Sequence, residues 1–587
     1  MRSKRNGRAG SGPPADVSNR STASPPYLLQ LFSWAAIALV FVPALLGTFY
    51  MLLMAFSGGE GPLQAFTVLF QVPGIATSIG LSLWIGLVAT AFSVLVTALF
   101  FAAFAHTRLI SVLSGLIRPL LAIPHAAAAF GMLFLVAPSG FLMRLATPVT
   151  GFVHPPDWLL VNDSAGLSLA AGLALKEVPF LFFVVLAALP QIDRRLTVTA
   201  ATLGYGRIWG FTLSAFPSLY AQIRLPIIAV IAYSTSSVDM AMILGPQLPP
   251  VLSVQILRLM NDPDLSLRTA AAAGAIVQLG VTALAIGLWL LAEKAVARLF
   301  RDLATRGIRL RADGAVRSAI LIVAAWTFLV TYIGLVLLLL WSVAATWRFP
   351  DLFPSRFTLD GWTAPGSDLI ELVWRSAALG IVSALAGTLM AVGALELEYR
   401  RGRVIGRGGW LSLYLPLLLP QIVFVSGLSF LFLRLGWDAN FLAVAAVHLV
   451  FVFPYVYLTL AAPWHHFDNR YLDIARSLGK SPLMALVRIR LPILLAPLLT
   501  AAALGFAVSI AQYLPTLLIG AGRLPTLTTE AVALSSGGNR RLIGVYALLQ
   551  AFLPFVIFAL AGLIPRLVWR NRLGLVSAVR EPSRQSA

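Results

Sequence analysis

The segment 464–492, WHHFDNRYLDIARSLGKSPLMALVRIRLP, is a polar and charged island between two long apolar runs. Its acidic residue Asp473 stands at the expected start of a helix, and Gly479 follows shortly afterwards. Glycine permits a tight turn and proline starts or stops a helix, so a short helix is expected between Gly479 and Pro492. The segment therefore predicts a short amphipathic helix that is fixed at both ends and lies outside the lipid.

A second copy of this arrangement lies earlier in the chain, at residues 189–217, LPQIDRRLTVTAATLGYGRIWGFTLSAFP. A constant offset of 275 residues places identical residues at Pro179 and Pro454, Asp193 and Asp468, Arg195 and Arg470, Ala200 and Ala475, Leu203 and Leu478, Gly204 and Gly479, and Pro217 and Pro492. Matches at this many positions in one register indicate an internal repeat. The first copy is degenerate, because Val198 stands where the second copy has Asp473.

The composition is that of a polytopic membrane protein. Of the 587 residues, 59% are hydrophobic and 11% are charged, and the mean hydropathy is +0.87. Soluble domains do not have this composition. The chain has no cysteine, which excludes disulfides, iron–sulfur clusters and thiolate metal sites.

Twelve apolar runs are long enough to cross a bilayer, which takes about 20 residues. They fall at roughly 28–56, 76–105, 117–138, 166–188, 227–245, 270–292, 318–342, 373–395, 410–433, 440–462, 493–520 and 542–565. Because each set of six contains an even number of spans, the two sets have the same orientation. The expected fold is all-α, with about 12 transmembrane helices in two parallel halves that are related by a pseudo-twofold axis.

The formal charge of +20 reflects membrane topology rather than nucleic-acid binding. With these spans, most of the 43 Lys and Arg residues fall on one side of the membrane. The positive-inside rule makes that side cytoplasmic, together with both termini and both polar segments. The expected organisation is a disordered basic cytoplasmic tail (1–27), a first six-helix half (28–292), a basic cytoplasmic connector (293–317), a second six-helix half (318–565) and a second cytoplasmic tail (566–587).

The chain shows no chemistry of its own. Gly479-Lys480-Ser481 is similar to the end of a phosphate-binding loop, but Ile474 stands where that loop needs its first glycine. The consecutive His465 and His466 do not share one helix face, so no metal site is expected. We find no pairing of a nucleophile with a base, and we expect no catalytic residue and no cofactor in this chain. The energy for any transport must come from a partner.

The spacing of the polar segments resembles the cytoplasmic loop of binding-protein-dependent ABC importer permeases: Glu-Ala-Ala, three residues, Gly, nine residues, Ile-x-Leu-Pro. The second copy has Asp473 in place of the Glu and ends in Ile489-Arg490-Leu491-Pro492. Over nearly all of residues 28–565, the chain resembles a fused, double-length type I permease. Such permeases are similar to those for ferric iron and thiamine and to an uncharacterised related branch.

The resemblance implies a permease subunit of a bacterial inner membrane, with a solute pathway between its two halves. A separate ATPase dimer, which binds the ATP, would dock on the two cytoplasmic loops, and a soluble solute-binding protein would dock on the opposite face. Short helices at about 205–216 and 480–491 would carry the motion of the ATPase to the spans. The implied coupling residues are Ala200, Gly204, Arg207, Pro217, Asp473, Ala475, Gly479, Arg488, Arg490 and Pro492. Their arginines either pair with acidic groups of the ATPase or are ordinary basic residues of the membrane interface.

Polar residues within the spans are candidates for the pathway, because charges in hydrocarbon are costly. Asp239 follows the first loop, and Gln512 and Tyr513 hold a similar place after the second. The helices after the loops line the pathway in related permeases, although hydrogen bonds between helices are an equal explanation. Lys176 and Glu177 are adjacent and point in different directions on a helix, so one of them can face the pathway.

Two other classes of function remain open. A secondary transporter can also have two six-helix repeats, but it leaves the matched Gly-to-Pro segments unexplained and needs coupling acids in several spans. A membrane scaffold without a transport role is the second alternative. The residues do not select a substrate, because one carboxylate, Asp239, tolerates a cationic solute without choosing among solutes.

Overall fold

A computed structural model describes residues 27–57, 61, 63–309, 311, 313–364, 366–402 and 406–570. The expected tails, 1–27 and 566–587, fall almost entirely outside these residues. Helices make up nearly all of the described part, and its two strands, β1 (Ala344–Thr346) and β2 (Arg356–Phe357), form one antiparallel pair. The prediction of an all-α polytopic membrane protein is confirmed.

Ten helical segments of the described chain are long and apolar enough to cross a membrane, and two bent helix pairs raise the number to as many as twelve. The helices in these ten segments are α1 (Tyr27–Phe56), α3 (Ile75–Phe104), α5 (His125–Val136) with α6 (Phe141–Thr150), α7 (Leu167–Ala188), α10 (Phe216–Ser236), α13 (Leu267–Thr305), α14 (Gly314–Val343), α16 (Gly366–Arg401), α19 (Phe441–His465) and α26 (Arg540–Val568).

Four predicted spans are broken in the structure, and the first of them, expected at 117–138, is divided between α4 (Arg108–Ala122) and α5. The span expected at 410–433 is formed by α17 (Arg407–Leu418) and α18 (Gln421–Leu435), which meet at 99°. Pro420 lies at this bend, where its missing N–H and fixed φ interrupt a helix. The span expected at 493–520 ends early, with α23 (Leu495–Ile510) followed by α24 (Leu514–Gly520), and the one at 227–245 is split into α10 and α11 (Asp239–Leu244).

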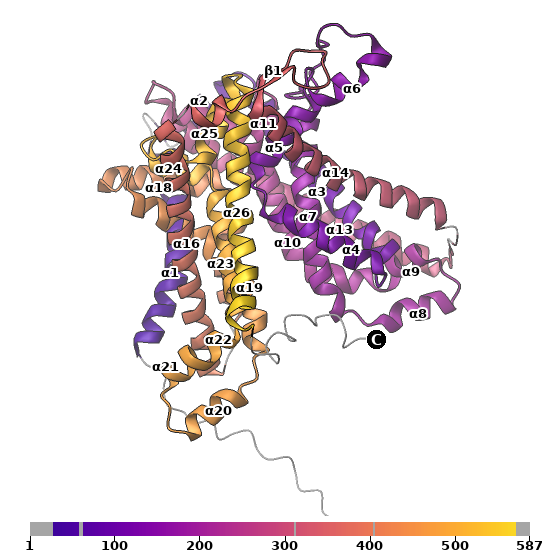
Figure 1. The fold of residues 1–587 in the computed structure, drawn as a ribbon, viewed down its shortest axis with the longest axis vertical. Helices are drawn as coiled ribbons and strands as arrows, with labels where there is room; N and C mark the ends of the chain where they lie inside the picture. Colours follow the sequence, from indigo (N-terminus) through magenta and orange to yellow (C-terminus); the bar gives the residue numbers. More distant parts are fainter. Residues whose placement is uncertain are drawn as a thin grey trace, which may run out of the picture.

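Short helices cap the two ends of the bundle (Figure 1). In Figure 1, α20 (Arg470–Ser477), α21 (Pro482–Ala485) and α22 (Leu491–Ile493) lie at the bottom, and α8 (Arg194–Thr202) and α9 (Arg207–Ser214) lie on the right, apart from them. The opposite end carries β1, α2 (Gln64–Gln71), α6 and α25 (Leu527–Ala533). The remaining helices are α4 (Arg108–Ala122), α12 (Leu252–Met260) and α15 (Asp360–Thr363).

The halves in space are not the halves in sequence, because each exchanges its first helix with the other. Helix α1 packs against α16, α18 and α19 while keeping a contact with α13 of its own half, and α14 packs against α3, α5 and α7 while keeping a contact with α26. Both exchanged helices cross their partner at paired glycines. A Cβ added to Gly427 would lie 1.9 Å from the carbonyl oxygen of Gly47, and one added to Gly131 would lie 2.9 Å from the Cα of Gly334. Glycine allows the two backbones to touch at each crossing.

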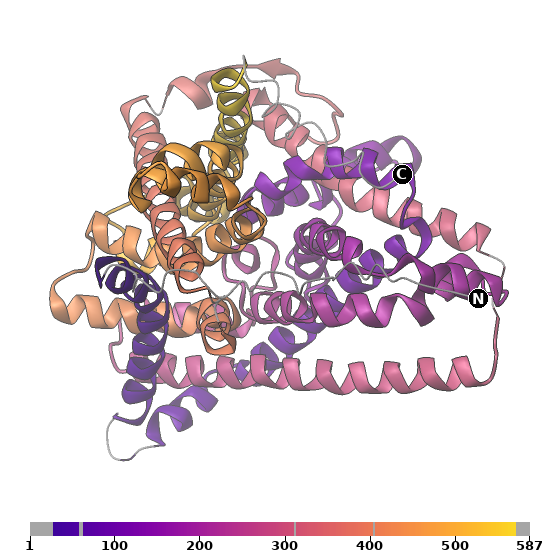
Figure 2. The same ribbon diagram turned by 90° about the horizontal axis from the view of Figure 1, so that it is seen from below.

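The connection between the halves begins as a helix. Helix α13 runs without a break from Leu267 to Thr305, and Figure 2 shows it as one long rod along the edge of the molecule. The first part of the expected connector, 293–317, is therefore an extension of a span. Its last part lies beside α9, which brings it to the first loop segment.

Candidate functional site

The two loop segments begin with the same backbone arrangement. The side chain of Asp193 accepts a hydrogen bond from the backbone N–H of Arg195 at 2.9 Å, and that of Asp468 accepts one from Arg470 at 3.0 Å. These two pairs are equivalent at the offset of 275 residues. Carboxylates at this position satisfy N–H groups that the first turn of a helix leaves free.

Both segments also turn in the same way at their glycines. Gly204 has φ +83° and Gly479 has φ +70°, in the left-handed region that favours glycine. After each glycine, the next backbone N–H returns to the carbonyl of the predicted alanine, at 3.1 Å to Ala200 and 3.0 Å to Ala475. This is the usual glycine ending of a helix, and it is repeated in the two copies.

A second short helix follows each turn and ends at the predicted proline. In the first copy it is α9; in the second it is α21, which continues through a π-helical turn, η2 (Leu486–Arg490), into α22. Pro217 lies in the first turn of α10, and Pro492 lies in the first turn of α22. Proline suits a first turn, where its missing N–H has no helical partner.

Arg490 is buried and engaged within the chain, which corrects the prediction that it could pair with a partner protein. Its side chain is 2% exposed, and its Nη1 lies 3.2 Å from Oε2 of Glu396. Its Nη2 donates to the carbonyl of Trp464 at 3.0 Å, and its guanidinium lies 4.3 Å from the Trp464 ring centre and 4.4 Å from that of Tyr399. Arg400 also pairs with Glu396, at 2.8 Å.

The other predicted coupling charges lie at the surface. Arg488, Arg207 and Asp473 are exposed. Asp473 pairs with Arg476 at 3.0 Å on the same helix. Arg207 donates a hydrogen bond to the carbonyl of Ala105. Of the three arginines, Arg490 is the one whose burial removes it from contact with a partner.

A second buried carboxylate supports the segment near Arg490. Glu398 accepts a hydrogen bond from the hydroxyl of Tyr457, and its Oε2 lies 3.1 Å from Nε2 of His465. Neither Glu396 nor Glu398 was recognised in the sequence as part of the site. Two glutamates at the end of an apolar run were a usable signal, because such charges are seldom placed in a span without a partner.

The first segment is attached to the connection between α13 and α14. Arg311 Nε donates to the carbonyl of Gly204 at 3.1 Å, and Trp209 Nε1 donates to the carbonyl of Ile308 at 2.8 Å. The carboxylate of Asp313 accepts a hydrogen bond from the backbone N–H of Ile208, the second residue of α9, at 3.3 Å. Nothing in the sequence of the segment indicated these partners, which lie about a hundred residues further along the chain.

Both segments expose apolar side chains at the surface of the molecule. In the second segment the exposed fractions are 59% for Ile474, 71% for Leu478, 66% for Leu483 and 51% for Val487. The first segment exposes Val198 and Leu203 similarly. Grouped apolar side chains at the surface are typical of a site that binds another protein.

The interior brings two of the three pathway candidates together. Asp239 is buried at the start of α11 and accepts a hydrogen bond from the Ser237 hydroxyl at 3.1 Å. The hydroxyl of Tyr513 lies 3.2 Å from the sulfur of Met242, which is in the same short helix, α11, as Asp239. Gln512 is buried next to Tyr513 in the chain. The contact joins the two sequence halves in the centre of the bundle.

Lys176 and Glu177 lie in the same interior region and have different surroundings. Lys176 Nζ donates to the carbonyls of Leu120 and Ile123, at 3.1 and 2.5 Å. Glu177 is buried, and within the described chain it has neither a hydrogen bond nor an ion pair within 4 Å. A buried carboxylate without such a partner is costly, which makes Glu177 a further candidate for the pathway.

Comparison with known proteins identifies the class of this arrangement. The chain is 30% identical over 552 residues to the inner membrane ABC transporter permease protein YnjC of Escherichia coli (strain K12), covering 94% of this chain and 99% of YnjC. It is 24% identical to the spermidine/putrescine transport system permease protein PotC of Haemophilus influenzae, over 32% of this chain and 70% of PotC. No protein-family model matches the chain.

A third relative covers a similar part of the chain. The putative 2-aminoethylphosphonate transport system permease protein PhnV of Salmonella typhimurium is 25% identical, over 38% of this chain and 85% of PhnV. The partial matches have lengths that suit one half of the chain, whereas the match to YnjC spans both halves. The chain therefore belongs to the ABC transporter inner-membrane permeases, in the fused double-length form, and is the transmembrane permease subunit of an ABC importer.

Proposed function

We propose that the chain couples a central solute pathway to a separate cytoplasmic ATPase dimer through its two loop segments. The observation that supports this most directly is the repeated turn. Asp193 and Asp468 accept matching hydrogen bonds, Gly204 and Gly479 have matching conformations, and both copies lie away from the end that carries β1, α2 and α25 (Figure 1). Two equivalent docking segments suit a partner with two equivalent subunits.

Each loop segment is held firmly enough to pass a movement of the ATPase on to the membrane-spanning helices. The first is tied to the connection between α13 and α14, and the second is tied to α16 by the buried pair of Arg490 and Glu396. Each also runs into the next span within a turn of its terminal proline. A displacement of α9 or α21 would therefore move α10 or α23 with it.

The pathway is proposed to run between the halves past Asp239, Glu177 and Tyr513. These residues bring polar groups from α11, α7 and the start of α24 into the interior of the bundle. The opposite end of the molecule, with β1, α2 and α25, would receive the solute-binding protein. In this orientation the loop segments and both termini lie in the cytoplasm.

Capture of the ATPase tests this proposal. We would replace one exposed residue in each segment, Val198→Asp and Leu483→Asp, and purify the tagged chain with its ATPase subunit in mild detergent. Burying two carboxylates in an apolar contact should remove the ATPase, while the thermal unfolding of the chain remains unchanged. Val149→Asp is the matched control, because Val149 is 92% exposed at the opposite end.

Retention of the ATPase by the double variant would show that the segments are not its docking site. Failure of the unaltered chain to recover any ATPase would contradict the coupling function itself. Neither result would change the assignment to the permease family, because that assignment depends on sequence similarity and not on how the ATPase docks.

The interior contact can be tested separately, because the chain has no native cysteine. The side chains of Met242 and Tyr513 meet at their ends, with the sulfur and the hydroxyl 3.2 Å apart. Met242→Cys with Tyr513→Cys places shorter thiol side chains at these two positions, and a bifunctional maleimide can join them across the added distance. If this contact opens and closes as solute passes, the rate of cross-linking should change when ATP is added to the assembled transporter. A rate that ATP does not alter would place the moving pathway elsewhere.

A further inference from the structure

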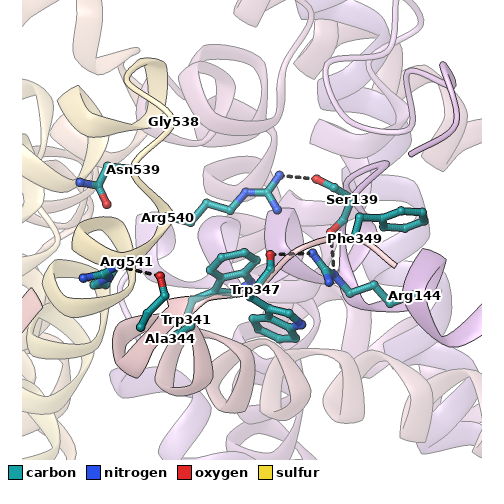
Figure 3. Close-up of a pocket in the computed structure, with 11 residues that line it drawn as sticks. Ser139, Arg144, Trp341, Ala344, Trp347, Phe349, Gly538, Asn539, Arg540 and Arg541 are labelled. Atoms are coloured by element: carbon teal, nitrogen blue, oxygen red, sulfur yellow. Dashed lines mark hydrogen bonds between the residues drawn. The ribbon is translucent and has the colours of Figure 1, made fainter. Parts of the chain in front are cut away.

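A cavity of about 380 Å³ lies at the end of the molecule opposite to the loop segments (Figure 3). Its walls come from α6 and the turn before it, from the end of α14 with the adjoining strand β1, and from the start of α26. Three arginines line it: Arg144, Arg540 and Arg541. The cavity therefore combines positive charge with surfaces from both sequence halves.

Arg144 contributes a buried charge that the described chain does not neutralise with an ion pair. Its side chain is 3% exposed, and its Nη1 donates to the carbonyls of Arg348 and Asp351 at 2.7 and 2.6 Å. Its Nε donates to the carbonyl of Ser139 at 3.1 Å, and its guanidinium stacks 4.9 Å from the ring centre of Trp347. These contacts fix the guanidinium in place while its positive charge remains.

Arg540 reaches across the cavity from the start of α26 (Figure 3). Its Nη2 donates to the Ser139 hydroxyl at 2.5 Å, and its guanidinium lies 5.1 Å from the ring centre of Trp341. It has no carboxylate within ion-pair distance in the described chain, so most of its donors are free. By contrast, the neighbouring Arg541 lies 3.7 Å from Asp360.

Two positive charges that repel each other in a partly closed space favour an anion between them. Arg144 is close enough for its charge to interact with that of Arg540, and the carboxylate of Asp351 offsets part of this repulsion without forming an ion pair within 4 Å in the described chain. The planar guanidinium of Arg540 offers N–H donors that match the oxygens of a phosphate, whereas Arg144 contributes its charge, because its own donors are directed at backbone carbonyls. The volume lies within the range of small-ligand sites.

We infer that this cavity is a binding site for a phosphate group, held chiefly by Arg540 beside the fixed charge of Arg144. The group can be supplied by a phospholipid headgroup or by a free phosphate-bearing anion, since both present the same oxygens. The inference depends on the chain being a membrane permease and is independent of how the ATPase docks. A ligand here would bridge α26 and the turn between α5 and α6.

Thermal unfolding of the purified full chain tests the site. The protein in uncharged detergent would be titrated with inorganic phosphate, with sodium chloride at matched ionic strength as the reference. In parallel, the protein in the same detergent would be titrated with phosphatidylglycerol, with diacylglycerol, which has the acyl chains but no phosphate, as the reference. The midpoint of unfolding should rise with at least one phosphate source and not with chloride or diacylglycerol.

Arg540→Gln should weaken the apparent affinity for the active phosphate source at least about tenfold, because it removes charge-assisted hydrogen bonds. Arg523→Gln is the matched control, because Arg523 is 72% exposed in the turn between α24 and α25 and pairs with Asp438. Arg540→Lys keeps the charge without the planar fork and should fall between the wild type and Arg540→Gln. It also provides a test if Arg540→Gln does not fold.

The two arms of the experiment distinguish the sources. A shift with inorganic phosphate alone assigns the site to a free anion, and a shift with phosphatidylglycerol alone assigns it to a lipid headgroup. Equal shifts in the wild type and in both Arg540 variants, equal shifts with chloride or diacylglycerol, or no shift with either source would overturn the inference.

Discussion

The two loop segments share a backbone and differ in how they are held. In the second segment, a buried ion pair joins Arg490 to Glu396. At the equivalent position of the first segment, 275 residues earlier, stands Ala215, which is fully buried and apolar. The first segment instead accepts a hydrogen bond from Arg311 at Gly204. The repeat therefore preserves the shape of the loop and not the chemistry that anchors it.

The fused chain explains how the first segment can use this anchor. The connection from α13 to α14 passes beside α9, so a covalently attached stretch is always available to support it. The corresponding stretch after α26 begins at residue 571, outside the described residues. In the first half, the linker thus has a second role as a brace for a loop with a degenerate sequence.

The largest effect on this comparison is expected from Arg490→Ala. The substitution leaves Glu396 buried with Arg400 as its remaining cation and empties the space between Tyr399 and Trp464. The free energy of unfolding should fall by about 3 kcal/mol, as when one member of a buried pair is removed. Denaturant unfolding of the purified protein measures this loss.

Arg488→Ala is the control for that measurement. Arg488 is exposed on the same segment, so its loss should change the free energy of unfolding by less than about 0.5 kcal/mol. Similar losses in both variants would mean that the buried pair is not the anchor of the second segment.

The exchanged helices provide a second contrast between the halves. Gly427→Ala forces a methyl group against the Gly47 carbonyl, and Gly131→Ala meets Gly334 at a longer distance. Overpacking should cost about 1–3 kcal/mol, with the larger loss at Gly427. Thermal unfolding should show little change for Gly280→Ala, where nothing lies within 4 Å of the added group. An equal loss at Gly280 would contradict a specific role for the crossings.

The turns themselves should respond less strongly. Gly204→Ala and Gly479→Ala each place a Cβ in a left-handed conformation, which costs about 1 kcal/mol. The added group at Gly204 would also lie 2.9 Å from Arg311 Nη2, whereas nothing lies within 4 Å at Gly479. Denaturant unfolding should therefore show the larger loss for Gly204→Ala. The reverse order would mean that Arg311 moves aside freely and does not hold the turn.

The smallest and most local effect is expected from Arg311→Ala. It removes one hydrogen bond to the first segment, worth about 1 kcal/mol. Hydrogen exchange should accelerate for amides in residues 204–210 and stay unchanged in residues 479–485. Equal acceleration in both ranges would show that the two segments are coupled more tightly than their separate anchors indicate.

Local signals predicted the turns and the helix ends of the site. Gly204, Gly479, Pro217 and Pro492 act through their own backbone restrictions, so their spacing was sufficient. The partners of these segments were not predictable from the same stretches. Glu396 lies 94 residues before Arg490. The sequence around Arg490 does not indicate which distant side chain will pair with it.

The arrangement of the spans was predicted only in part. Hydropathy located the apolar runs, because length and composition decide which segments suit the membrane. Hydropathy did not reveal that α1 and α14 each pack against the opposite half. Both helices are apolar on most sides, so no pattern in their sequences indicates which helix they contact. The proline at position 420 is a local signal for the bend, whereas the length and hydropathy of 410–433 predict one continuous span.

The exchange of first helices also sets an order of events during synthesis. Helix α1 ends at Phe56, and its partner α18 begins at Gln421, so most of the chain must be made before the two can meet. At ribosomal rates this interval lasts about twenty seconds to a minute. During that time α1 can pack against α13, which ends at Thr305, but Gly47 still lacks the backbone of α18 that it contacts in the finished fold. The contact between α1, the first helix to be made, and α18 therefore forms late in the folding of the permease.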